Sequence, residues 1–277
     1  MNPSLYRHRE FLTCWLAAGL ALAAFSVVVA AQPAPAARAM IPDRPSKTDG
    51  PFTLDAGRGQ LELEFFTHTR DDEAGVSTRA WSIGSTFVRW GATPQFELQL
   101  GCQTYARVTV DEGSQSSRAT GFGDTVVRAK YNLWGNDGGD TAFALLPFVK
   151  IPTNQDGLGN NALEPGCSLP LVVNLPDGWQ LGLMAKWSRL LDGDGRSRHN
   201  FFEYSAIGGH AITAKLSAYG EYWIGRSDET GASTQSSVGF GFGYSLSDRA
   251  ILDGGVNLAL NRATPDAAFF CGYSVRF

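Results

Sequence analysis

The chain has little charge and few long apolar runs, and each shortage excludes a class of protein. Charged side chains make up 18% of the 277 residues and the formal net charge is −4, which gives no electrostatic basis for binding nucleic acid. A helical membrane protein would show repeated runs of about 18 apolar residues, whereas a single such run occurs here, near the N-terminus. A disordered chain would carry more charge and fewer aromatic residues than the 12% present.

Cysteine is also scarce. Four cysteines are present, and Cys14 falls in the N-terminal apolar run. The other three, Cys102, Cys167 and Cys271, are an odd number, widely spaced, with no CxxC pair and no histidine cluster nearby. They predict neither a disulfide framework nor a metal site. No nucleotide fingerprint or energy-coupling motif is visible, so the sequence predicts no metal, no cofactor and no catalytic residue.

The N-terminus has the layout of an export signal. Residues 7–9 are basic, residues 11–31 are apolar, and small residues end the run. We predict a cleavable signal peptide over residues 1–31; the alternative is an uncleaved anchor helix. Residues 32–58 are rich in Pro, Ala and Asp and are predicted to form a periplasmic N-terminal segment. Within it, residues 43–53 have no strand pattern, and we hypothesise that they fold into the periplasmic mouth.

Glycine and aromatic residues are abundant, and their arrangement predicts β-structure. The chain holds 32 glycines in a composition that is 43% apolar, with a mean hydropathy of −0.13. From Gly59 onward, apolar and polar residues alternate: Leu61 and Leu63 share one face and Glu62 and Glu64 the other. The same alternation predicts about twelve strands, at residues 59–69, 79–90, 95–109, 122–134, 141–151, 166–175, 178–189, 200–209, 213–225, 234–246, 250–261 and 266–277.

The connections between these strands indicate a membrane barrel. Short turns alternate with longer polar loops, including residues 71–77 and 111–120, as in outer-membrane barrels with short periplasmic turns. A soluble β-sandwich or a lipocalin is the alternative. Trp179 and Trp187 lie eight residues apart on one apolar face, which is about 20 Å along the axis of a tilted strand and fits two aromatic girdles. The sequence thus predicts an all-β fold: a single antiparallel transmembrane β-barrel of about 12 strands over residues 59–277, preceded by a signal peptide and a short linker.

The C-terminal strand has a pattern that outer-membrane barrels commonly share. Aromatic and apolar residues occupy alternate positions up to a terminal phenylalanine: Tyr273, Val275 and Phe277. We interpret these three as an assembly signal for the barrel-assembly machinery. Outer-membrane lipid is the second expected partner, and the bacterial outer membrane is the expected location.

Several short motifs of this chain occur together in one protein family. They are Asp43-Arg44-Pro45, Thr48, Pro51-Phe52-Thr53, Gly59-Gln60-Leu61-Glu62, Gly121-Phe122-Gly123-Asp124, Ala129-Lys130-Tyr131, Leu146-Pro147 and Lys150-Ile151-Pro152-Thr153. The family that they resemble is one of outer-membrane transporters named for the MetA pathway of phenol degradation. The resemblance extends from about residue 42 to 277, implies an outer-membrane barrel, and supplies no proven substrate and no catalytic residue. Its departures are Ser46-Lys47, Asp49-Gly50 and Asn154.

The polar face of the predicted strands should line the barrel interior. A lysine or arginine facing lipid at mid-depth would cost about 2–4 kcal/mol, so an interior location is preferred. We expect a channel or transporter for passive passage of small solutes, with apolar or aromatic ones as candidates; a structural or plugged barrel is the alternative. The predicted pore-lining residues are Glu62, Glu64, Glu97, Gln99, Arg107, Asp124, Arg128, Lys130, Lys150, Lys186, Glu203, Lys215 and Glu221.

An outer-membrane lipid-modifying enzyme is a further alternative, because barrels of this size include lipid hydrolases. Such a site needs a nucleophile and a base near one rim. His199 lies in a predicted outer loop, but no Ser-Asn pair of the kind found in barrel phospholipases is near it in the sequence. The Asp-Gly-Asp-Gly sequence at residues 192–195 resembles part of a calcium loop, yet it lacks the remaining ligand spacing of an EF-hand. We therefore interpret it as a polar loop and expect no enzyme.

Overall fold

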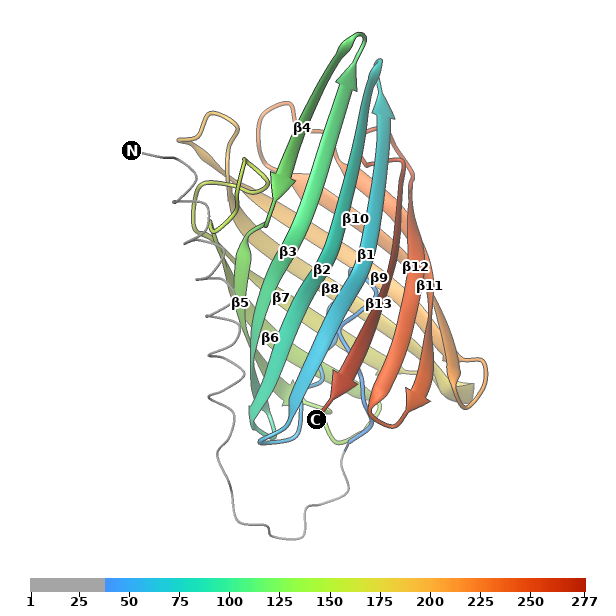
Figure 1. Ribbon diagram of the computed structural model, residues 1–277. Coiled ribbons are helices and arrows are strands. Elements are labelled where there is room, and N and C mark those ends of the chain that lie inside the picture. Colours follow the sequence, from blue (N-terminus) through green and yellow to red (C-terminus); the bar gives the residue numbers. More distant parts are fainter. Residues whose placement is uncertain (1–37) are drawn as a thin grey trace. The chain divides into compact units, whose positions relative to one another are not determined.

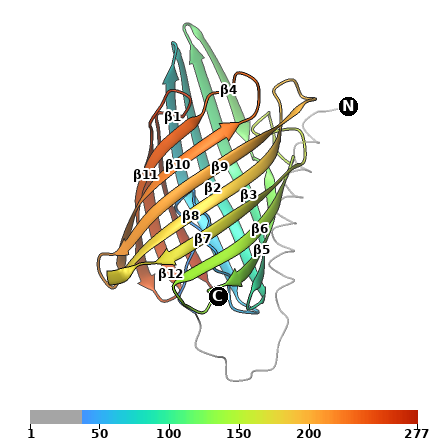
Figure 2. The same ribbon diagram turned by 180° about the vertical axis from the view of Figure 1, so that it is seen from behind.

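A computed structural model describes residues 38–277, and they form one closed antiparallel β-barrel (Figures 1 and 2). Strands that are neighbours in sequence pair with each other, except that β4 and β5 both pair with β3, and β13 pairs with β1 to close the sheet. The strands are β1 (Gly59–Glu73), β2 (Val76–Thr93), β3 (Phe96–Glu112), β4 (Gln115–Gly121), β5 (Thr125–Trp134), β6 (Thr141–Ile151), β7 (Glu164–Asn174), β8 (Trp179–Leu191), β9 (Arg198–Ala211), β10 (Leu216–Ser227), β11 (Gln235–Ser247), β12 (Ala250–Ala259) and β13 (Ala267–Arg276).

The thirteen strands fill twelve places in the barrel. The upper part of β3 pairs with β4 and its lower part pairs with β5. β4 and β5 are therefore one wall strand interrupted at residues 122–124, where the chain leaves the ladder. The predicted barrel of about twelve strands is confirmed.

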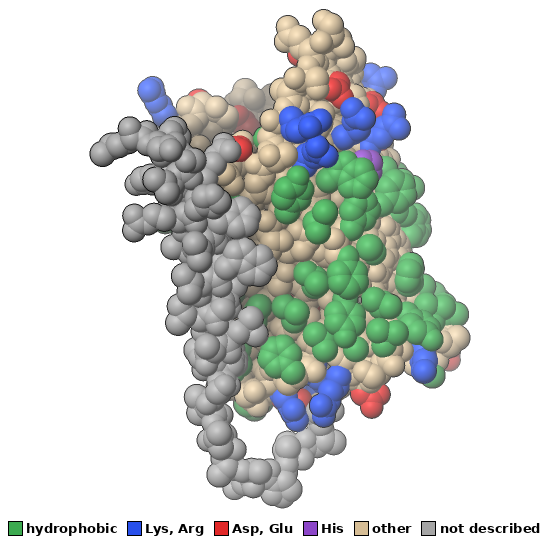
Figure 3. Space-filling view, in the orientation of Figure 1, with side chains coloured by type: hydrophobic (Ala, Val, Ile, Leu, Met, Phe, Trp, Pro, Cys, Tyr) green, Lys and Arg blue, Asp and Glu red, His purple; other side chains and the backbone are tan. Residues whose placement is uncertain are grey.

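The side chains are arranged inside out compared with those of a soluble protein. Large apolar residues such as Phe65, Leu98 and Phe240 are 42–53% exposed, and they form a broad band on the outside (Figure 3). Charged residues such as Glu97 and Lys130 are fully buried. An apolar exterior around a charged interior suits a wall that faces lipid on one side only.

The two rims differ in the length of their connections. The C-terminus and the short turns lie at one rim, whereas the β1–β2 and β3–β4 hairpins extend far beyond the opposite rim (Figure 1). Residues 71–77 and 111–120, which were predicted to be loops, are mostly strand with tight turns at their tips. That prediction was wrong because these strand ends are polar on both faces, so they lack the alternation by which strands are recognised in a sequence.

A row of irregularities crosses β1, β2 and β3 at Phe65, Gly84 and Thr104. Gly84 has a φ of +73°, and the Thr104 hydroxyl donates to the carbonyl oxygens of Ile83 (2.8 Å) and Gly84 (3.0 Å). On each of the three strands, the residues that face outward have odd numbers on one side of this row and even numbers on the other. On β2, for example, odd-numbered Arg89 is buried in the lumen below the row, whereas odd-numbered Ile83 is 50% exposed above it.

The predicted signal peptide and the start of the linker lie outside the described residues. Within residues 38–277, no helix is long and apolar enough to cross a membrane. The helix that is present, Pro176–Gly178, is a single 3₁₀ turn between β7 and β8. At the C-terminus, Phe277 exchanges backbone hydrogen bonds with Gly59 (2.9 and 3.1 Å), so Tyr273, Val275 and Phe277 lie along the seam that closes the barrel. Their recognition by assembly machinery stays a prediction.

Candidate functional site

Residues 38–55, named here the luminal loop, enter the barrel from the rim that carries the C-terminus and return to it. The two ends of the loop meet: the backbone N–H of Arg38 donates to the Asp55 carboxylate at 3.1 Å. Arg38 is also tied to that rim through Asp137 (2.7 Å) and through the guanidinium of Arg276, which donates to its carbonyl oxygen at 2.6 Å. The loop is therefore fixed at its base and projects into the lumen (Figure 1).

Asp43 is the central anion of the site. Its carboxylate forms an ion pair with Lys130 at 2.7 Å, lies 3.6 Å from Arg89, and accepts a hydrogen bond from Gln99 at 3.1 Å. Burial alone would raise the pKa of Asp43, but the positive charges of Arg89 and Lys130 outweigh this effect and hold the pKa well below its usual value. Asp43 is thus an anion at every physiological pH.

Glu62 and Glu97 complete this buried network from the wall side. Arg89, which is 1% exposed, forms ion pairs with Glu62 (2.7 Å) and with Glu97 (2.8 Å). Glu62 also accepts the backbone N–H of residues 43 and 44, and Glu97 accepts that of Leu54. The wall carboxylates therefore satisfy backbone donors of the loop, which has no secondary-structure partners of its own.

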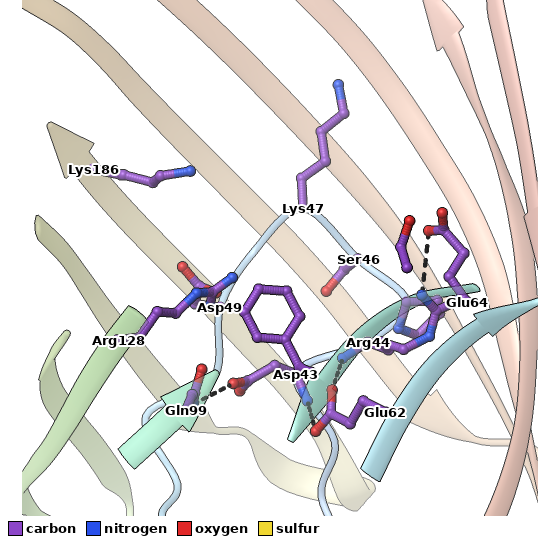
Figure 4. Close-up of a pocket in the computed structure, with 13 residues that line it drawn as sticks. Asp43, Arg44, Ser46, Lys47, Asp49, Glu62, Glu64, Gln99, Arg128 and Lys186 are labelled. Carbon is purple, nitrogen blue, oxygen red and sulfur yellow. Dashed lines mark hydrogen bonds and ion pairs between the residues drawn. The ribbon is translucent and has the colours of Figure 1, made fainter. Parts of the chain in front are cut away.

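Arg44 contacts the adjoining part of the wall, beyond β2. Its guanidinium donates to Asp253 on β12 at 2.9 Å and to Glu64 on β1 at 3.3 Å. Figure 4 shows Arg44 between the loop and this part of the wall. Together Asp43 and Arg44, adjacent in sequence, link strands β1, β2, β5 and β12 across the barrel interior.

The tip of the loop binds β10 through Glu221. The Glu221 carboxylate accepts the backbone N–H of Lys47 (3.1 Å) and of Thr48 (2.8 Å), as well as the Thr48 hydroxyl (2.5 Å). The Lys47 ammonium lies 3.9 Å above the ring of Trp223 and donates to Ser237. Burial lowers the pKa of Lys47, although Glu221 and Glu203 oppose this shift. Lys47 stands at the top of the loop in Figure 4.

Two adjoining cavities remain around the loop. One, of about 210 Å³, lies between the loop and strands β1–β3, and the other, of about 310 Å³, lies against β5–β9. Both are lined by Asp49, Arg128 and Lys186, and Arg128 forms an ion pair with Asp49 at 2.8 Å. The lumen is therefore narrowed by the loop but retains polar space on both sides of the Asp49–Arg128 pair.

Eleven of the thirteen predicted pore-lining residues face the barrel interior or the edge of its lumen. Lys186 pairs with Glu203 at 2.9 Å, and Lys150 bridges Glu164 (2.5 Å) and Asp124 (3.7 Å) near the outer rim. The eleven are Glu62, Glu64, Glu97, Gln99, Asp124, Arg128, Lys130, Lys150, Lys186, Glu203 and Glu221.

Two of the expected positions were wrong. Lys215 is exposed in the turn between β9 and β10, because β10 begins only at Leu216. Arg107 lies on the outer surface beside Trp81, which is 40% exposed, because the irregularity at Thr104 reverses the facing of β3. Arg89 and Asp253 also face the lumen, but the sequence analysis did not predict them. Both alternate with outward-facing apolar residues, so their facing could have been predicted. Their contacts with the luminal loop could not, because the loop lies far away in the sequence.

One group of side chains in the described part of the chain has the composition of a metal site. Potential ligand atoms of Asp192, His199 and Glu229, all near the outer rim, lie within 4.8 Å of one another. The Nδ1 atom of His199 is 2.6 Å from the Asp192 carboxylate, so the pair is joined directly by a hydrogen bond. This contact accounts for the proximity of Asp192 and His199 without a metal.

Comparisons with known proteins agree with the barrel. An outer membrane channel from Pseudomonas putida F1 is similar in structure, with a TM-score of 0.61 and 15% sequence identity, over 84% of this chain and 99% of that one. The NanC porin is similar with a TM-score of 0.52 and 10% identity, over 77% and 98%. No curated protein sequence matches. The model of the family described as "Putative MetA-pathway of phenol degradation" matches residues 42–277, and the chain therefore belongs to this family.

Proposed function

We propose that the protein is an outer-membrane channel for passive passage of small solutes, with its width set by the luminal loop. The observation that carries this proposal is the loop itself. It is held to the wall by side-chain contacts to β1, β2, β3, β5, β10 and β12, and cavities of about 210 and 310 Å³ remain beside it. Such a loop narrows the lumen to the size of a small molecule while leaving a polar route past it.

The lining of the cavities indicates the chemistry of the solute. Both signs of charge are present, and aromatic rings lie among them: Phe87 in the smaller cavity, Phe148 and Phe201 in the larger. The Arg128 guanidinium is 4.2 Å from the Phe87 ring centroid. A small solute that combines an apolar or aromatic body with a polar group could contact both kinds of side chain on the way through.

The test is reconstitution of the mature protein in planar bilayers and in liposomes. We expect a small ion conductance and swelling with small solutes from the wild type, and a several-fold larger conductance from a variant lacking residues 39–54. Heat-dependent gel mobility would establish that the variant is still a folded barrel. Equal conductance of the two proteins would contradict the role of the loop. Absence of permeation by any solute through either protein would contradict the channel.

A plugged structural barrel is the second candidate, and the burial of the loop favours it. Thr48, Pro51, Thr53 and Leu54 are almost inaccessible, so the loop fills much of the lumen near its base. The reconstitution distinguishes the two candidates, since a structural barrel would pass nothing in its wild-type form and would open only when residues 39–54 are removed.

We propose no catalytic activity toward lipids. His199 is held by the Asp192 carboxylate, and residues 200 and 228 are joined by their own hydrogen bonds beside it. Release of fatty acid from phospholipid by the purified protein, with loss of that activity in His199→Ala, would establish an enzyme instead. We expect neither protein to release fatty acid.

A further inference from the structure

A basic surface lies outside the barrel on β1–β4, above the row of irregularities. Cross-strand pairing places Arg70, Arg79, Thr109 and Arg118 in one row across the four strands. The next row toward the membrane holds His68, Trp81 and Arg107, again as direct cross-strand neighbours. These seven residues, named here the arginine surface, line a depression of about 410 Å³.

Part of the positive charge on this surface is uncompensated. Arg70 pairs with Asp72 at 2.5 Å, and Arg79 pairs with Asp111. Arg107 and Arg118 form no ion pair within residues 38–277, and the Nε atom of Arg107 is buried without a hydrogen-bond partner. Four arginines against two aspartates leave a net charge of 4 − 2 = +2. A buried guanidinium donor without an acceptor is costly, so an anionic ligand would be stabilised here.

The position of the arginine surface identifies the type of anion. Ile83 (50% exposed) and Tyr105 (40% exposed) lie directly below it and belong to the apolar band. The space-filling view shows basic side chains grouped at the upper edge of this band, with the extended hairpins above them (Figure 3). A ligand bound here would have its charged group level with the arginines and its acyl chains against the apolar band.

We propose that the arginine surface binds a phosphate group of lipid A, the membrane anchor of lipopolysaccharide, in the outer leaflet. Guanidinium groups donate forked hydrogen bonds that match phosphate oxygens, and four of them lie on one sheet face across neighbouring strands about 4.8 Å apart. Trp81, between His68 and Arg107, supplies the amphipathic ring that suits the membrane boundary; its ring lies 4.0 Å from that of His68. The coordinated irregularity at Phe65, Gly84 and Thr104 turns Arg70, Arg79 and Arg107 from the lumen to the lipid.

The test uses the full mature chain refolded without lipopolysaccharide, in detergent with a chelator present. Binding is measured by native mass spectrometry for bisphosphorylated lipid A, for lipid A with both phosphates removed and for inorganic phosphate. The test variant is Arg107→Gln combined with Arg118→Gln. Arg196→Gln, at an exposed loop arginine elsewhere on the outer rim, is the matched control.

We expect the wild type and Arg196→Gln to bind bisphosphorylated lipid A, and the double variant to bind it at least about tenfold more weakly. Equal binding of the dephosphorylated lipid would overturn the proposal, and so would full binding by a folded double variant. Saturation by inorganic phosphate at the same concentration would show a plain anion site and would also overturn it. The comparison of lipids on the wild type decides the question even if the double variant fails to fold.

Discussion

At the scale of single residues, Asp43 joins the luminal loop to two buried cations of the wall. It neutralises Lys130, which is fully buried, and contributes to the balance of Arg89, which is 1% exposed. A buried ion pair adds little net stability compared with apolar groups of the same shape, because both charges must be dehydrated. Removal of one partner is different, since the remaining charge stays buried without compensation.

Asp43→Asn should therefore destabilise the barrel strongly. The amide keeps the size of the side chain but removes the carboxylate 2.7 Å from Lys130, which is left with Glu97 at 3.7 Å, a carboxylate that already pairs with Arg89. The expected loss is about 3–5 kcal/mol in the free energy of unfolding. Urea unfolding of the protein in detergent or lipid would measure this loss. Asp177→Asn is the control, because Asp177 is exposed in the turn before β8 and asparagine tolerates its φ of +58°. Equal stability of the two variants would count against the network.

The lowered pKa of Asp43 predicts how this difference depends on pH. A folded-state pKa below the unfolded value of 3.8 means that the folded protein binds the proton more weakly than the unfolded chain does. Stabilisation by Asp43 is then fully present above about pH 4 and is lost as the pH falls below that value. The difference in unfolding free energy between wild type and Asp43→Asn should be constant from about pH 5 to 8 and shrink in stronger acid. A difference that changed most near neutral pH would contradict this assignment.

Alternation alone predicted the interior facing of eleven of the thirteen residues expected to line the pore, because facing is a local property of a strand. Partners could not be predicted in the same way. Lys130 and Asp43 are 87 residues apart, and Arg44 and Asp253 are 209 apart. Nothing in the sequence near either residue specifies such a pair, and Arg89 was missed for this reason.

At the scale of elements, the alternation of apolar and polar residues predicted the strands of the barrel wall. It did not predict the places where these strands are irregular. Predicted and observed limits agree for β6, residues 141–151, because this largely apolar segment is bounded by turn residues at 138–140 and by Pro152. The prediction failed for β4, which is polar on both faces, and for the facing of β3 above Thr104. The sequence analysis assumed a constant period of two, so it could not detect the point at which odd and even residues exchange sides. For this reason it predicted that Arg107 faces the lumen.

Gly84→Ala tests the irregularity directly. Gly84 has a φ of +73°, and an added Cβ would collide with the Thr104 hydroxyl, so the substitution should cost about 1–3 kcal/mol in unfolding free energy. Gly208→Ala on β9 is the matched control, because a Cβ there would meet no atom within 4 Å. Urea unfolding would compare the two variants. Similar midpoints would show that Gly84 is not required for the change of facing.

At the scale of the whole molecule, the barrel separates two environments for similar side chains. Trp187 is 38% exposed on the outer wall, whereas Trp223 is 6% exposed inside, where it donates to Glu203 at 3.2 Å and lies under Lys47. Alternation on a closed sheet produces this separation, because residues of opposite parity face opposite sides of the wall. Composition alone does not show it: a mean hydropathy of −0.13 averages an apolar exterior with a charged interior.

Fluorescence quenching by brominated lipids should distinguish the two environments. A protein that retains only Trp187, with the other tryptophans changed to Phe, should lose most of its emission when bromine is carried on the acyl chains. A protein that retains only Trp223 should lose little, since the wall and the luminal loop separate its ring from lipid. Water-soluble acrylamide is the complementary probe, and it should reach Trp223 more readily once residues 39–54 are deleted. Equal quenching of Trp187 and Trp223 by the brominated lipid would mean that the apolar band does not face the bilayer, and the membrane orientation of the barrel would have to be abandoned.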